Sequence, residues 1–203
     1  MKKLVGRVLL IGLFVVFFWC GMLIADKAAV RRELIRLHVV AASDSEADQA
    51  LKLRVRDAVL ESLNCGMADV TDRTQAFAYL EENLTKIEKV AKEALLQQGC
   101  EDTVRVSLAE EAFPTREYET FSLPAGVYDA LRIVIGEGEG QNWWCVVFPQ
   151  LCIPATQAEF ETSAVSSGFS TELSHTLSGE NGYEFRFFLL ECLGKIENFF
   201  HRG

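Results

Sequence analysis

The feature that most constrains this chain is a glycine-rich turn between two runs of large apolar side chains. Gly136, Gly138 and Gly140 alternate with glutamates and separate the apolar run 130–135 from the block 142–148. Two β-type runs joined by a short glycine turn predict a β-hairpin. Trp143 and Trp144 are adjacent, so on a strand their side chains point to opposite faces. We therefore expect one Trp in the core and the other on a second surface, where it either packs or anchors a partner.

A second constraint is the uncharged run 8–25, which follows Lys2, Lys3 and Arg7. As a helix it rises about 27 Å, close to the hydrocarbon thickness of a bilayer. The residues around 25 lack the small-residue pattern of a signal-peptide cleavage site, which favours an anchor over a cleaved signal. The chain then divides into a cytoplasmic tail (1–7), a signal or transmembrane helix (8–25) and an extracytoplasmic domain (26–203).

The composition narrows the classes of partner. The net charge is −9 over 203 residues. This sign argues against nucleic-acid binding and against adsorption to anionic lipid. Of the six cysteines, none forms a Cys-x-x-Cys pair. Cys145 and Cys152 are the candidate disulfide, because Pro149 can turn the chain between them, and buried free thiols are the alternative.

The apolar pattern predicts secondary structure in blocks. Strands are expected over 33–42, 103–109, 128–137 and 142–148, and helices over 46–63 and 72–98. Residues 183–190 are interpreted as a strand leading into a short helix to 200, and the unpatterned segment 155–182 as a variable loop. Blocks of helices and strands indicate an α+β fold, in which an antiparallel helical pair packs on a mainly antiparallel sheet.

The pattern also assigns faces within these elements. On the first strand, Leu34, Arg36 and His38 share one face and Ile35, Leu37 and Val39 the other. On the first helix, Lys52, Arg54, Arg56 and Asp57 are assigned mostly to the solvated face. Cys65 and Cys100 fall at opposite ends of the helical pair, so we expect no bond between them.

The sequence offers little chemistry for catalysis. His38 stands near Asp44, and a thiol-dependent enzyme that uses Cys145 with His38 is the alternative function. No local motif supports it, and a hydrogen-bonded structural histidine is the simpler interpretation. The glycine turn lacks the Gly-x-Gly-x-x-Gly spacing of a dinucleotide site, and its glutamates would repel phosphate. No metal-ligand spacing is present, so no cofactor, metal or small-molecule ligand is expected.

Three motifs carry a resemblance to a known family. Residues 37–45 with 48–57, residues 130–138 with 142–152, and residues 185–191 resemble the stage II sporulation protein R family. The resemblance covers about 33–153 and 183–197. The Asn-Trp-Trp-Cys block at 142–145 is its most specific part, and Gln150 departs from the family, which usually has a second proline there.

The resemblance implies an exported, non-enzymatic signal of endospore formation. Family members pass into the space between forespore and mother cell and activate a membrane-embedded aspartic protease, which processes the sigma-E precursor. On this basis we predict a partner-binding surface made by His38, Asp44, Asn142, Trp143 and Trp144.

Overall fold

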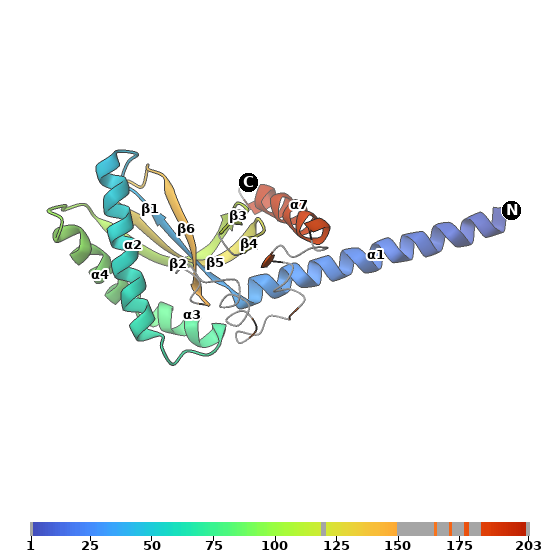
Figure 1. Ribbon diagram of the computed structural model, residues 1–203, viewed down its shortest axis with the longest axis horizontal. Helices are drawn as coiled ribbons and strands as arrows, with labels where there is room; N and C mark the ends of the chain where they lie inside the picture. The colour runs from blue at the N-terminus through green and yellow to red at the C-terminus, as the bar shows by residue number, and fades with distance from the viewer. Residues whose placement is uncertain are drawn as a thin grey trace.

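The computed structural model describes residues 2–118, 121–149, 165, 171, 177–178 and 184–201 (Figure 1). Its helices are α1 (Lys2–Glu33), α2 (Glu46–Gly66), α3 (Arg73–Glu82), α4 (Leu84–Leu96) and α7 (Glu184–His201). Its strands are β1 (Ile35–Val40), β2 (Val104–Phe113), β3 (Arg116–Glu117), β4 (Ser122–Leu123), β5 (Gly126–Ile135) and β6 (Asn142–Phe148). The predicted α+β class is confirmed.

The central sheet has four strands in the order β2-β5-β1-β6. β2 pairs with β5 and β1 with β6 in antiparallel fashion, whereas β1 and β5 are parallel. The sheet is therefore mixed, and the prediction of a mainly antiparallel sheet holds for its two outer pairings. β3 and β4 form a separate two-stranded ribbon.

One face of the sheet packs against α2, α3 and α4. Ile35, Leu37 and Val39 of β1 lie fully buried in this layer, with the alternation that the sequence predicts. Ser45 caps the N-terminus of α2, because its Oγ accepts a hydrogen bond from the Asp48 N–H at 3.1 Å. In Figure 1, α4 runs back alongside α2. The longer helix of the predicted pair, expected over 72–98, is interrupted, however.

The split lies at Asn83, which ends α3 and begins α4. Its side-chain Nδ2 donates to the carbonyl of Tyr79 at 2.8 Å, so the side chain bonds to the backbone at the point where the helix is interrupted. The predicted single helix over 72–98 is therefore two helices.

The other face of the sheet is covered only in part. Its second core contains Val30 and Leu34 with Phe113 of β2, Tyr128 of β5 and Phe121, which comes just before β4. The C-terminal end of α1 and one side of α7 contact the sheet on this face. Figure 1 shows the rest of α1 extending away from the sheet. Toward the C-terminal end of β1, Ser107, Arg132 and Asn142 on this face are exposed, and we call this part of the sheet the open face.

The predicted β-hairpin is wrong, because β1 lies between β5 and β6. The glycine-rich segment instead carries the chain across the end of β1, where the Gly140 N–H donates to the Ala41 carbonyl at 3.0 Å. A Cβ at Gly140 would lie 2.2 Å from the Ser43 carbonyl oxygen. Gly136 and Gly138 have φ of 57° and 71°, which favour glycine. The glycines thus serve a crossover.

Two further expectations fail. Residues 184–190, predicted as a strand, form the first two turns of α7. Their closely spaced Phe and Leu residues suit either period, and the i,i+4 pair Glu191–Lys195 supports the helix at 2.7 Å. Lys52, assigned to the solvated face, is 4% exposed, and its Nζ donates to Gln49 Oε1 and to the carbonyl of Gln141.

The predicted membrane segment remains a prediction. Within the part of the chain that the structure describes, no helix is long and apolar enough to cross a bilayer. Many side chains of 8–25 lie outside the description, as does the 155–182 segment apart from 165, 171 and 177–178.

Candidate functional site

The strand register brings four polar or aromatic side chains into one row across the open face. Arg132 of β5 and Trp144 of β6 are the direct neighbours of His38 on β1, and Ser107 of β2 is the neighbour of Arg132. Side chains in such a row stand side by side on the same face. Asn142 and Glu111, which lie further along their strands, reach toward the same point. We call His38, Glu111, Arg132, Asn142 and Trp144 the His38 cluster.

His38 is the centre of this cluster and is 6% exposed. Its Nδ1 lies 2.8 Å from Glu111 Oε2, and its Nε2 lies 2.7 Å from Asn142 Oδ1. Its ring stacks on Trp144 with centroids 3.9 Å apart. Both ring nitrogens are therefore occupied and the ring plane is fixed. This arrangement matches a hydrogen-bonded structural histidine better than a free general base.

The exposed edge of the cluster is made by Arg132 and Asn142. Arg132 Nη1 lies 3.2 Å from Glu111 Oε1, and its side chain is 45% exposed. Asn142 is exposed as well. One oxygen of the Glu111 carboxylate thus contacts His38, and the other pairs with Arg132. The cluster presents a rigid polar rim beside an aromatic ring, a composition suited to contact with another protein.

A second group of buried side chains supports the cluster from the next row of the sheet. Arg36 is fully buried, lies 4.2 Å from the ring centroid of Phe113 and donates from Nη2 to Tyr118 Oη at 2.9 Å. Tyr128 also lies beside it, at 5.1 Å from the Arg36 Cζ to the ring centroid. Burial raises the pKa of Tyr128, while the charge of Arg36 opposes the rise. Phe113 in turn meets Trp144 edge to face at 4.6 Å, so the two rows are packed together.

The structure groups three of the five predicted partner-binding residues and separates two. His38, Asn142 and Trp144 are in direct contact. Asp44 lies at the end of the sheet, where its Oδ1 accepts from the Gln141 N–H at 2.7 Å and so positions the start of β6. Trp143 points to the helical side, where the Arg56 guanidinium stacks on its ring at 4.3 Å. The opposite orientation of the two Trp residues agrees with the prediction.

The geometry separates the proposed thiol pair. Cys145 follows the alternation of β6 and packs in the core under the helices, whereas His38 faces the other side of the sheet. Cys145 is also disulfide-bonded, which leaves no thiolate to attack a substrate. Its predicted partner, Cys152, lies outside the described residues. Cys65 and Cys100 are free, as expected.

Sequence reasoning missed Glu111 and Arg132. Glu111 lies beyond the strand predicted over 103–109, but β2 extends to Phe113, and the Glu111 carboxylate lies 2.8 Å from His38 Nδ1. Arg132 interrupts an apolar strand, and that interruption was the available signal. In the described part of the chain, no group of three or more His, Cys, Asp or Glu side chains could hold a metal ion.

A family model and a curated relative point to the same protein family. The family model described as Stage II sporulation protein R (spore_II_R) matches residues 31–158, which include β1 to β6 and the helices between them. The stage II sporulation protein R of Bacillus subtilis (strain 168) is 39% identical over 120 residues, which make up 59% of this chain and 54% of the relative. The match thus spans about half the length of that curated relative. No solved structure shows significant similarity to the chain.

Proposed function

The chain belongs to the stage II sporulation protein R family, and from this premise we propose that it is an exported, non-enzymatic signal that activates a membrane-embedded aspartic protease and so triggers processing of the sigma-E precursor. The observation that carries the proposal is the open sheet face. The His38 cluster is rigid and partly exposed, while its histidine has both ring nitrogens occupied. A rigid, partly exposed site of this kind suits recognition by another protein better than catalysis.

The proposal places the domain outside the cytoplasm, held by α1 or released from it. The exposed apolar side chains of α1 support a membrane environment for that helix. They are Leu10, Ile11, Leu13, Phe14, Phe18 and Met22, each 47% to 71% exposed. Side chains of this size rarely line a water-exposed helix over four turns. Three basic residues, Lys2, Lys3 and Arg7, precede them and favour a cytoplasmic N-terminus.

The protease is proposed to contact the exposed rim of the His38 cluster. Arg132 and Asn142 offer a cation and an amide at the surface, and the half-buried Trp144, on the same strand as Asn142, lies on the other side of His38 from Arg132. Specific protein interfaces are commonly centred on such a combination of Trp and Arg. Among the described residues, the other side of the sheet is packed against α2 to α4.

The test uses single alanine variants in cells that hold the protease and the sigma-E precursor. Arg132→Ala and Asn142→Ala each remove one rim side chain; Arg132→Ala also removes a partner of Glu111, and Asn142→Ala the partner of His38 Nε2, so the protein level is measured beside processing. We expect both to lower the fraction of processed precursor several-fold at unchanged protein level. Arg54→Ala, an exposed arginine on α2, is the matched control and should process normally. Normal processing by both rim variants would remove this face from the proposal.

A further inference from the structure

The C-terminal helix carries large apolar side chains on the side that faces away from the protein. Phe188 and Ile196 are 55% and 56% exposed, and Phe199 and Phe200 are each 76% exposed. Positions 188, 196 and 199 are eight and three residues apart, so they share one face of the helix. We call these four residues the outer face of α7. A helix at the surface of a water-soluble domain normally presents polar residues there.

The inner side of α7 is fixed on the domain, so the outer face is not exposed through loose packing. Leu190 is fully buried. Gly194 lies so close to the sheet that a Cβ there would be 1.6 Å from the Ala125 carbonyl oxygen. Asn198 Nδ2 donates to the Phe113 carbonyl at 2.7 Å. The helix therefore has one apolar side against the protein and a second one toward its surroundings.

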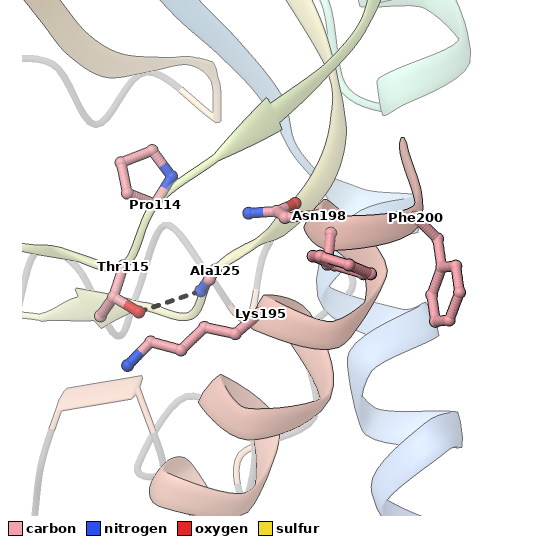
Figure 2. A pocket seen from close by; sticks show the side chains of 7 residues that line it. Pro114, Thr115, Ala125, Lys195, Asn198 and Phe200 are labelled. Carbon is pink, nitrogen blue, oxygen red and sulfur yellow. Dashed lines mark hydrogen bonds between the residues drawn. The ribbon is translucent and has the colours of Figure 1, made fainter. Parts of the chain in front are cut away.

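An open groove continues the outer face at the C-terminal end of the helix (Figure 2). Its volume is about 940 Å³, and its walls are Pro114, Thr115 and Ala125 on one side and Lys195, Asn198, Phe199 and Phe200 on the other. The Ala125 N–H donates to Thr115 Oγ1 at 3.2 Å, which holds the opposite wall in place. The groove and the outer face together form one apolar surface, with the Lys195 ammonium group at its rim.

This surface lies close to the segment that we propose as the membrane anchor. Arg31 of α1 pairs with Glu197 of α7 at 3.3 Å, and Figure 1 shows α7 alongside the C-terminal half of α1. If 8–25 spans the hydrocarbon core, Arg31 stands six residues beyond it, about 9 Å at 1.5 Å per residue. The headgroup region extends roughly 5 to 7 Å beyond the hydrocarbon on each side. The Arg31–Glu197 pair then stands about 2 to 4 Å outside the headgroups, a distance that a Phe side chain of α7 can span.

We propose that the outer face of α7 and its groove contact the lipid bilayer in which α1 is anchored. Interfacial helices bury their apolar side about 5 to 10 Å into the boundary between headgroups and acyl chains. The outer face is apolar and the chain as a whole is acidic, so we expect a contact that does not depend on anionic lipid. The inference rests on the proposed membrane role of α1. It adds that the domain is oriented on the membrane by two helices rather than tethered by one.

The experiment uses the full chain reconstituted in vesicles of zwitterionic phosphatidylcholine. A photoreactive benzoyl-phenylalanine replaces Phe188, Phe199 or Phe200, one at a time. The same group at Phe14 of α1 is the positive control for inserted residues. At Leu96, which is 50% exposed on α4 at the far side of the sheet, it is the matched control for an exposed apolar residue. After irradiation, mass spectrometry identifies the adducts.

We expect lipid adducts at Phe14 and on the outer face of α7, with none above background at Leu96. Raising the salt concentration should leave the adducts unchanged. Lipid adducts at Phe14 without any at the three α7 positions would overturn the inference while leaving the anchor intact. Adducts to a second copy of the chain would overturn it in favour of self-association, and absence of adducts at Phe14 would overturn both roles. Precursor processing, measured separately, tests the signalling function independently of this outcome.

Discussion

At the scale of single residues, the site depends on His38 as a connector between strands. The imidazole joins Glu111 of β2 and Asn142 of β6, two strands that do not touch each other in the sheet. Its stacking on Trp144 fixes the ring that the proposed interface uses. A side chain of similar shape without the nitrogens would keep the stacking and lose the connection.

His38→Phe tests that connection. The Phe ring leaves the partly buried Glu111 carboxylate with Arg132 as its remaining partner among the contacts described above. We expect the free energy of unfolding to fall by about 1–3 kcal/mol, the usual cost of removing one partner of a buried polar group. Urea denaturation measures the change. His201→Phe at the exposed end of α7 is the control, and equal stability of both variants would contradict the connecting role.

Lys52 gives a residue-scale prediction about pH. Burial lowers the pKa of its ammonium group below 10.5, with Asp44 opposing the shift and Arg56 adding to it. The unfolded chain therefore binds more protons than the folded chain between the two pKa values, and folding is favoured as the pH rises through that window. The stability of the wild type relative to Lys52→Met should increase from about pH 7 to about pH 10.

Urea denaturation of both proteins at the two pH values measures this difference. Lys89→Met, at a lysine that is 76% exposed, is the control and should show a much smaller change. If the stability of the wild type relative to Lys52→Met instead decreased toward high pH, burial would not be destabilising the charged form of Lys52. The burial of Lys52 could not be predicted from the sequence, because its position on α2 fits the solvent-exposed face. The Gln141 carbonyl that accepts its hydrogen bond belongs to a segment distant in the chain.

At the scale of elements, local pattern predicted most strands and helices but not their neighbours. The alternation on β1 and the opposite faces of the two Trp residues follow from period two, so both were predictable. The placement of β1 between β5 and β6 was not, because a glycine turn between apolar runs fits a hairpin and a crossover equally well. The distinguishing contact, Gly140 against Ser43, joins residues almost a hundred positions apart. Glu111 escaped prediction for the same reason.

Gly194→Ala tests how tightly α7 is held. Its methyl group would overlap the Ala125 carbonyl oxygen, which belongs to the backbone and cannot rotate away. We expect α7 to shift or detach and the melting temperature to fall, with a cost of roughly 1–3 kcal/mol as in overpacked cores. Gly99→Ala would not serve as a control, because Gly99 has φ of 74°.

The suitable control is Ala78→Ser on the exposed side of α3. Thermal unfolding measures the change, and hydrogen exchange along 184–201 shows whether the loss is local to α7. Unchanged exchange in that segment would mean that the close approach of α7 to the sheet is not needed to hold the helix.

At the scale of the whole molecule, Arg31 connects the parts that the proposals assign to different tasks. It extends from α1, pairs with Glu110 of β2 and pairs with Glu197 of α7. Glu110 and Glu111 are consecutive residues of β2, so the strand that pairs with Arg31 also supplies Glu111 to the His38 cluster. An anchor that is fixed to the sheet and to α7 sets the direction in which the open face points relative to the bilayer.

Arg31→Ala should separate orientation from stability. Both pairs are partly exposed, and such pairs contribute about 0–1 kcal/mol, so the melting temperature should change little. Precursor processing should nevertheless fall, because the domain is then free to turn about the end of α1 and the rim at Arg132 no longer faces a membrane-embedded partner in a fixed direction. Lys89→Ala, which removes the exposed Lys89–Glu93 pair on α4, is the matched control and should process normally. Processing by Arg31→Ala at the wild-type level, with the protein still in the membrane fraction, would show that activation needs only proximity to the protease and not a fixed orientation.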